Sequence, residues 1–170
     1  MCGLVGALTF DKADTKPEDK IRRESLIFLT TQLLQATVER GQDATGVSLL
    51  WENGNYTGLK MGIPAPDFIS RWGETEKDFE GLLKVWREYP RQLKVYLGHC
   101  RKSSIGNSFN NINNHPVQIG NLLMIHNGTL TNHDIIFEKL GCKRVGEVDS
   151  EAITRLLHLY SKNGTEPFTL

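Results

Sequence analysis

The chain has 170 residues, enough for one domain with a hydrophobic core and too few for two ordinary domains. Twenty basic residues balance twenty acidic ones, so the composition gives no reason to expect nucleic acid or an anionic membrane as a partner. The first residues lack a basic segment and no stretch approaches a membrane span, so we expect a cytoplasmic protein without a secretory signal. Three cysteines are too few for a disulfide scaffold, and this low number also favours a reducing compartment.

Hydrophobic periodicity and turn residues predict strands and helices along the whole chain. The first half is expected to contain a strand over 3–10, a helix over 18–39, a hairpin of 47–51 with 56–60, and a helix over 78–89. In the helix over 18–39, Leu26, Leu29, Leu33 and Val38 mark the expected apolar stripe, and Gly41 supplies the stop.

The second half predicts a strand over 93–100, a polar loop over 101–116 and a second hairpin that turns at Gly120 and Asn121. Helices are expected over 132–140 and 149–162, followed by a loose tail over 163–170. Hairpins imply antiparallel pairing, so the predicted fold class is α+β rather than a doubly wound parallel sheet. We expect residues 1–170 to form a single domain.

Cys2 occupies a position at which a cysteine can serve as an N-terminal nucleophile. A cysteine near a terminus is more often a small buried hydrophobe. Methionine is normally removed when the second residue is small, however, and removal of Met1 would give Cys2 a free α-amine. Because that amine is a weaker base than lysine, it can accept the thiol proton at neutral pH. Cys2 would then be both nucleophile and base.

Two polar clusters could bind the ends of a substrate. Arg101 ends a predicted strand and is followed by two serines, a natural grip for a carboxylate, although a single loop arginine is more often only solvated. Asp149 precedes a predicted helix, where it could face an ammonium group or, as is more frequent, cap the helix.

Two further clusters have both a structural and a catalytic interpretation. His126-Asn127-Gly128 ends an apolar strand and resembles a tight turn, but the Asn127 amide and the Gly128 N–H could also stabilise an oxyanion. Arg40 lies in the segment ERGQDATG, whose glycines suit a helix cap and a turn without explaining the arginine. Phosphate-binding glycine motifs and zinc-like spacings are absent from the sequence, so neither a cofactor nor a metal is expected.

Together, these motifs resemble the class II glutamine amidotransferase domain. The resemblance runs from Cys2 to about Leu159 and rests on the ordered segments Met-Cys-Gly, RGQDATG, GHCRKSSIG, NNHP, HNGTL and VDSE. This family of domains includes the glutaminase parts of amidophosphoribosyltransferase, glucosamine-6-phosphate synthase and asparagine synthetase. The resemblance implies an N-terminal-nucleophile hydrolase fold, a four-layer αββα sandwich with antiparallel sheets.

The resemblance also implies catalytic roles for particular residues. Cys2 would be the nucleophile, Asn127 and Gly128 the oxyanion hole, and Arg40 would order the backbone around the nucleophile. The implied reaction is hydrolysis of L-glutamine to glutamate and ammonia through a γ-glutamyl thioester on Cys2. This mechanism requires that Met1 is removed.

Substrate binding is implied at a second set of positions. Arg101, helped by Ser104, would bind the glutamine α-carboxylate, and Asp149 would bind the α-amino group. His115 would support the loop that carries the site. Two differences from the family pattern concern this region: Lys102 stands where tryptophan is frequent, and the segment SSIG stands where ATHG is frequent.

The length of the chain bears on its partners. Family domains usually continue with strands that complete the second sheet, so the chain is expected to be a shortened version, a fragment, or a domain completed from elsewhere. An uncovered sheet edge would favour oligomerisation or pairing with another chain. We expect ammonia to pass to a separate synthase partner. Two alternatives are another N-terminal-nucleophile amidohydrolase and an inactive homologue that retains a binding or regulatory role.

Overall fold

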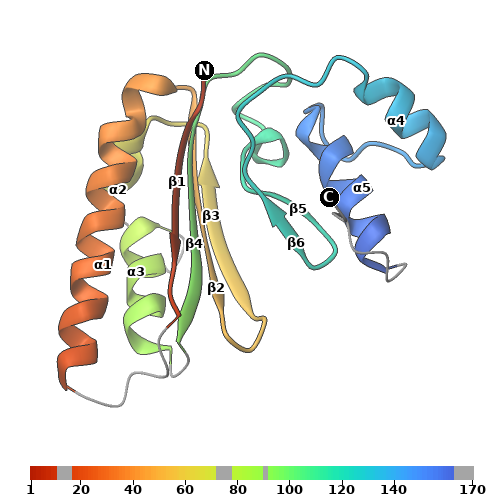
Figure 1. The fold of residues 1–170 in the computed structure, drawn as a ribbon. Helices are drawn as coiled ribbons and strands as arrows, with labels where there is room; N and C mark the ends of the chain where they lie inside the picture. Colours follow the sequence, from red (N-terminus) through yellow and green to blue (C-terminus); the bar gives the residue numbers. More distant parts are fainter. Residues whose placement is uncertain (11–16, 72–77, 90–91, 163–170) are drawn as a thin grey trace.

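The computed structural model describes residues 1–10, 17–71, 78–89 and 92–162 (Figure 1). The predicted tail over 163–170 lies outside these residues. The strands are β1 (Gly3–Leu8), β2 (Ala44–Trp51), β3 (Tyr56–Met61), β4 (Leu93–Arg101), β5 (Val117–Ile119) and β6 (Leu122–Met124). The α-helices are α1 (Pro17–Ala36), α2 (Ala65–Ser70), α3 (Phe79–Glu88), α4 (His133–Leu140) and α5 (Ser150–Lys162), and the 3-10 helices are η1 (Thr37–Arg40) and η2 (Asn111–Asn113).

The strands form one four-stranded sheet and one hairpin. The order in the larger sheet is β1-β4-β2-β3, and every neighbouring pair is antiparallel. Figure 1 shows α1, α2 and α3 on one side of this sheet and the β5–β6 hairpin, followed by α5, on the other. The predicted α+β class is therefore confirmed. Nearly every residue of β2 is buried, as expected for a strand covered on both faces.

Helix α1 packs on the sheet through a stripe that matches the predicted one only in part: Leu26, and Val38 in η1, pack against the core as expected. The buried residues of α1 are Ile27, Thr30 and Leu34, whereas Leu29 and Leu33 are 53% and 44% exposed. A glycine in the facing strand β4 favours this orientation. A Cβ at Gly98 would lie 3.2 Å from a methyl carbon of Leu34, so the absence of a side chain lets α1 approach closely on that face.

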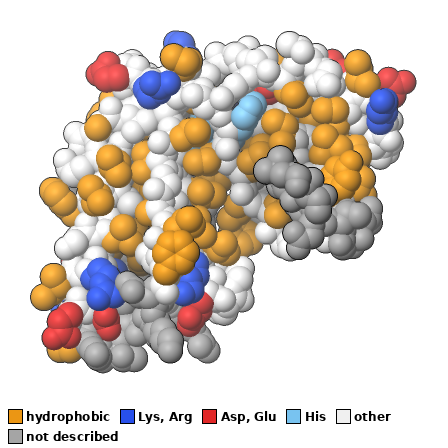
Figure 2. All heavy atoms as spheres, viewed as in Figure 1, with side chains coloured by type: hydrophobic (Ala, Val, Ile, Leu, Met, Phe, Trp, Pro, Cys, Tyr) orange, Lys and Arg blue, Asp and Glu red, His pale blue; other side chains and the backbone are white. Residues whose placement is uncertain are grey.

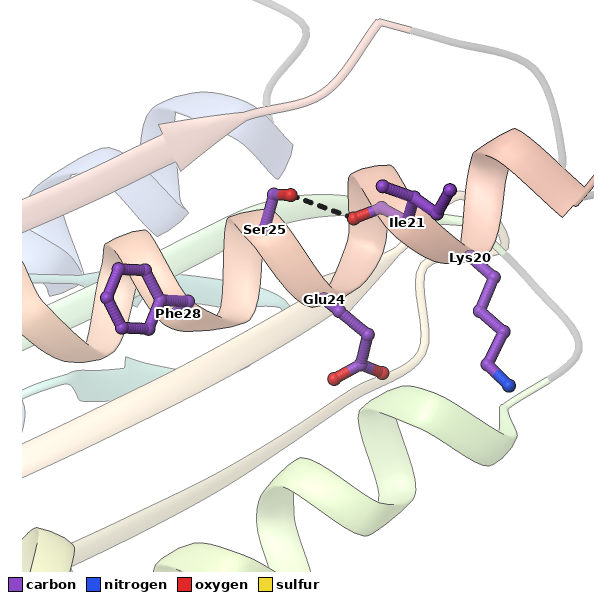
Figure 3. A pocket seen from close by; sticks show the side chains of 5 residues that line it. All are labelled: Lys20, Ile21, Glu24, Ser25 and Phe28. Carbon is purple, nitrogen blue, oxygen red and sulfur yellow. Dashed lines mark hydrogen bonds between the residues drawn. The ribbon is translucent and has the colours of Figure 1, made fainter.

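The outer face of α1 carries a shallow hollow of about 460 Å³ (Figure 3). Ser25 Oγ donates a hydrogen bond of 2.9 Å to the Ile21 carbonyl along this face. Glu24 also pairs with Arg87 of α3, which fixes α1 against that helix. The residues that line the hollow are Lys20, Ile21, Glu24, Ser25 and Phe28.

The second half of the chain is joined to the larger sheet by polar contacts. Lys60 Nζ on β3 donates hydrogen bonds of 2.8 and 3.1 Å to the carbonyls of Asn114 and Pro116. Burial lowers the pKa of Lys60, and the two carbonyls solvate its ammonium in place of water. The His115–Pro116 peptide bond is cis. These contacts hold the segment before β5 against the edge strand of the sheet.

Charged side chains on the surface do not separate by sign. On the face seen in Figure 2, Lys and Arg lie close to Asp and Glu, and hydrophobic side chains are spread over both halves of the molecule. Among the helices of the described residues, none combines the length and the apolar composition that crossing a membrane requires.

Candidate active site

Cys2 lies immediately before β1, at the end of the larger sheet where β4 finishes. The antiparallel register places Gly3 opposite Cys100, which brings Cys2 beside the residues that follow β4. The Lys102 backbone N–H points at Cys2 Sγ at 3.3 Å, and the thiol lies 3.5 Å from the Lys102 carbonyl. The sulfur can thus accept a hydrogen bond from the Lys102 N–H and donate one to the Lys102 carbonyl.

Two side chains hold the backbone of Cys2 from opposite sides. The Cys2 N–H donates to Asn127 Oδ1 at 3.0 Å, and Arg40 Nε donates to the Cys2 carbonyl at 3.1 Å. Arg40 is the last residue of η1, and Gly41 packs against the backbone of Arg101 so closely that a Cβ would collide with it. This contact explains why the arginine reaches Cys2: the glycine lets the end of η1 lie directly on β4.

Arg101 is buried, with 3% of its surface exposed, and most of its hydrogen bonds are internal. Its guanidinium donates to Asn114 Oδ1 at 2.9 Å, to the Gly106 carbonyl at 3.1 Å and to the Ile105 carbonyl. Burial lowers the pKa of Arg101, and the negative charge of Cys2 and of nearby carboxylates opposes that shift. Three of the five N–H groups of this arginine are thus used within the protein.

Ser104 is exposed and makes no hydrogen bond within the described residues. The neighbouring Ser103 is the serine that turns inward: its N–H donates to Asp43 Oδ2 at 2.7 Å, and its hydroxyl is buried. The other Asp43 oxygen lies 4.0 Å from Lys102 Nζ. Asp43 and Ser103, rather than Ser104, therefore hold the segment after β4, in which the Lys102 backbone contacts the thiol.

Asp149 is buried at the start of α5, and both of its oxygens accept backbone hydrogen bonds. Oδ1 accepts from the Ser150 N–H at 2.9 Å, and Oδ2 accepts from the Leu130 N–H at 2.5 Å. The second bond ties α5 to the segment over 125–130 that contains Asn127 and Gly128. Asp149 is thus coupled to the residues beside Cys2. Oδ1 also lies 3.5 Å from Ser150 Oγ, so Oδ2 is the oxygen that keeps a further lone pair for a ligand.

A buried group of histidines, of which the sequence indicated only His115, lies behind this segment. His99 and His115 stack with their ring centroids 4.2 Å apart. His115 Nε2 lies 2.9 Å from Ser150 Oγ, which also lies 3.1 Å from His126 Nδ1. His99 Nε2 donates to the His126 carbonyl at 3.0 Å. Apart from His115, the sequence signalled this group only through His126, the first residue of the His-Asn-Gly segment.

The two stacked histidines are held neutral. Burial is the main cause that lowers the pKa of His99, to about 4, and of His115, to about 2. The hydrogen bond to the His126 carbonyl opposes the shift of the His99 pKa, whereas the charge of Arg101 adds to it. The charges of His99, Arg101, His126 and Lys60 lower the pKa of His115 further. Within the described residues, no three His, Cys, Asp or Glu side chains are arranged to hold a metal ion.

The lowered pKa of His99 predicts acid destabilisation. An unfolded histidine takes up a proton near pH 6.5, whereas folded His99 does so only near pH 4. The stabilisation from His99 is therefore complete above pH 6.5 and is lost as the pH falls toward 4. We expect the free energy of unfolding to fall by about 1–2 kcal/mol per such histidine between pH 7 and 5. Denaturant unfolding of wild type and His99→Gln should show a flatter pH dependence for the variant, and equal slopes would contradict this assignment.

The structure thus brings together most of the residues that the sequence selected. Cys2, Asn127 and Arg40 are in direct contact, and Gly128 adjoins Asn127. Arg101 ends β4 directly before Lys102, whose backbone contacts the Cys2 thiol. Asp149 reaches the same segment through Leu130, and His115 lies behind it through Ser150. Ser104 is exposed and has no hydrogen bond to any of these residues.

Comparison with known proteins finds distant relatives. The glutamine–fructose-6-phosphate aminotransferase (isomerizing) of Sulfurisphaera tokodaii is 27% identical over 172 residues, which cover 99% of this chain and 25% of that protein. The enzyme of the same name from Escherichia coli K12 is 25% identical over 167 residues, covering 96% of this chain and 23% of that protein. The chain is distantly similar to glutamine–fructose-6-phosphate aminotransferases. It spans about a quarter of their length.

Other comparisons add little. No family model matches the chain. A solved complex of the beta-clamp processivity factor and the little finger domain of PolIV aligns with a TM-score of 0.38 and 13% identity, over 61% of this chain and 92% of that chain. A likeness this low has no bearing on fold or function. The similarity to the aminotransferases, in contrast, supports a relationship to glutamine amidotransferases.

Proposed function

We propose that the chain is a class II glutamine amidotransferase domain that hydrolyses L-glutamine to glutamate and ammonia with Cys2 as its nucleophile. The observation that carries the proposal is the contact of the Cys2 N–H with Asn127 Oδ1 beside a thiol that faces the Lys102 N–H. Removal of Met1 would turn that N–H into a free amine at the same place. The distant similarity to glutamine–fructose-6-phosphate aminotransferases points to the same substrate.

The contacts suggest how the first half of the reaction proceeds. The Cys2 amine takes the thiol proton, and the thiolate attacks the side-chain amide carbon of glutamine. The negative charge that develops on the carbonyl oxygen is stabilised by Asn127 Nδ2 and the Gly128 N–H. Asn127 Oδ1 already accepts from the Cys2 nitrogen. The side-chain amide of Asn127 would therefore orient the Cys2 amine through its oxygen and donate to the oxyanion through Nδ2. Collapse breaks the C–N bond, and the amine gives its proton to the departing ammonia.

In the second half of the reaction, water attacks the γ-glutamyl thioester. The Cys2 amine takes a proton from this water, the C–S bond breaks to release glutamate, and the amine returns the proton to the Cys2 thiolate. Of the other cysteines, Cys100 is fully buried, and burial raises the pKa of its thiol to about 11. A thiol of this kind is a poor nucleophile at neutral pH. Cys2 is therefore the better assignment.

Substrate binding is proposed at Arg101 and Asp149. The guanidinium of Arg101 donates to two loop carbonyls, Ile105 and Gly106, and a glutamine α-carboxylate would replace them as the stronger acceptor. The carboxylate of Asp149 would accept the α-ammonium, with its bond to Leu130 retained. Ser104 would reach the substrate only if the loop after Lys102 changed conformation.

The remaining parts of the proposal concern architecture and partners. The order of helices, sheet, β5–β6 hairpin and α5 is compatible with the αββα sandwich of N-terminal-nucleophile hydrolases (Figure 1). We propose that the chain forms a single domain. The hairpin β5–β6 is only two strands wide among the described residues, so it can accept further strands from the same or another chain. We propose that the ammonia is used by a synthase subunit or domain.

Covalent labelling tests the proposal. A diazoketone analogue of glutamine should modify Cys2 stoichiometrically, read by intact mass and peptide mapping, and excess L-glutamine should protect it. The same mass spectrum reports whether Met1 has been removed. Failure of the analogue to label protein that lacks Met1 would overturn the proposed function and favour an inactive binding homologue. Labelling without glutamine protection would favour an amidohydrolase of another amide.

A further inference from the structure

We propose that Ser150, His99, His115 and His126 form a positioning network that holds Asn127 and Gly128 in the geometry that catalysis requires, an inference that rests on the proposed function. The four residues are called the histidine–serine network below. Its members come from β4, the segment before β5, the segment after β6, and the first turn of α5.

Asn127 and Gly128 lie in a segment without regular hydrogen bonding, between β6 and α4. Such a segment does not fix its own conformation, yet an oxyanion hole needs its donors placed within tenths of an ångström. The segment is held on each side of Asn127 and Gly128. His126 is bound through its carbonyl by His99 at 3.0 Å, and Leu130 is bound through its N–H by Asp149 at 2.5 Å.

The ring of His126 provides a further restraint. Its Nδ1 lies 3.1 Å from Ser150 Oγ, and its Nε2 lies against Gly128, where an added Cβ would be only 2.8 Å away. The ring thus lies between the start of α5 and the glycine whose N–H is proposed to bind the oxyanion. Gly128 has room for this ring because it lacks a side chain.

The direction of each hydrogen bond explains why a serine joins two histidines. A carbonyl only accepts, so His99 carries its proton on Nε2. Ser150 has one hydroxyl proton, two lone pairs and three polar neighbours: His115 Nε2 at 2.9 Å, His126 Nδ1 at 3.1 Å and Asp149 Oδ1 at 3.5 Å. One hydroxyl can therefore bond to both rings at once. A threonine could form the same bonds, whereas an alanine would leave two ring nitrogens without a partner.

The network also has an energetic cost that an ordinary core would avoid. His99 and Ser150 are each 1% exposed and His115 is 5% exposed, and the Nδ1 atoms of both histidines are buried without a hydrogen bond in the described structure. Buried polar atoms without partners destabilise a fold, and apolar residues of similar volume would pack there at no such cost. A positioning function accounts for polar residues at these places.

Steady-state glutamine hydrolysis per active site tests the network, with active sites counted by the diazoketone label. We expect Ser150→Ala and His126→Ala each to lower kcat about tenfold or more while KM changes less than threefold, because the oxyanion donors are displaced. His126→Asn should recover most of kcat, because its side-chain amide can bond to Ser150 from the position of Nδ1. Ser161→Ala, at the other end of α5, is the matched control and should behave as wild type.

A merely structural role would lower the number of active sites and leave kcat per site unchanged, and that result would overturn the proposal. Backbone NMR tests the network independently of turnover. Order parameters of Asn127 and Gly128 should be near 0.85 in wild type and fall toward 0.6 in Ser150→Ala but not in Ser161→Ala. Unchanged order parameters would overturn the network even in an active enzyme. Loss of order in a protein that never hydrolyses glutamine would support the network and reject the proposed function.

Discussion

Cys2→Ala is expected to abolish glutamine hydrolysis, with a fall in kcat of at least about 10⁴-fold, because no other group in the site can form the thioester. Folding should survive, since Cys2 is only half-buried at the start of an edge strand and its Asn127 and Arg40 contacts use backbone atoms. The free energy of unfolding should change by less than about 1 kcal/mol. Ammonia release, measured with a coupled assay, and denaturant unfolding check both expectations.

Alanine is a suitable replacement at this position because it is also small, so removal of Met1 should continue. Cys142→Ala is the matched control: Cys142 is a half-buried cysteine on the segment between α4 and α5, and its loss should leave ammonia release intact. Undiminished ammonia release by Cys2→Ala would contradict the assignment of the nucleophile. So would full turnover by wild-type protein whose mass shows that every chain keeps Met1.

The strands and hairpins could be predicted because their signals are local. The turn over 52–55 and the turn at Gly120, where φ is +57°, both carry residues that suit a tight turn, and the strands on each side follow directly. The end of the first helical segment and the start of the last were likewise marked, by Gly41, which follows η1 directly, and by Asp149, which precedes α5. Helix α2, only six residues long, was too short to show a period.

The rotation of α1 could not be predicted, because it depends on a contact between residues far apart in sequence. Leu33 and Leu34 are equally apolar, and Leu34 is the one that is buried, where Gly98 leaves room for its side chain. Tertiary packing of this kind overrides a stripe read from one helix alone.

Some residues of the candidate site could likewise be predicted from the sequence, and others could not. Cys2 could be selected from its place in the chain, and Asn127 from the motif around it. The network behind them could not, because its members are separated by up to 51 residues and a lone histidine or serine is usually a surface residue. The burial of Arg101 was equally hidden: only the fold shows that its guanidinium already binds the carbonyls of its own loop.

Asn127→Ala is expected to lower kcat by about 10²–10³-fold, the loss that follows removal of one oxyanion donor. The side chain is exposed, so the substitution should have little effect on stability. Asn121→Ala, an exposed asparagine in the β5–β6 turn, is the matched control and should keep wild-type kcat. A fall of less than tenfold, or a rise in KM alone, would contradict a role for Asn127 in the transition state.

Asn127→Asp separates the two contacts that are assigned to this amide. An aspartate keeps an oxygen to accept from the Cys2 nitrogen, which Asn127 Oδ1 now binds at 3.0 Å, but it has no N–H to donate and it adds a negative charge. If the oxyanion contact dominates, the aspartate variant should be at least as slow as the alanine variant, since like charges repel in the transition state. If orientation of the amine dominates, the aspartate should restore activity relative to alanine. Because the proposed mechanism places the developing charge next to Nδ2, we expect the first outcome.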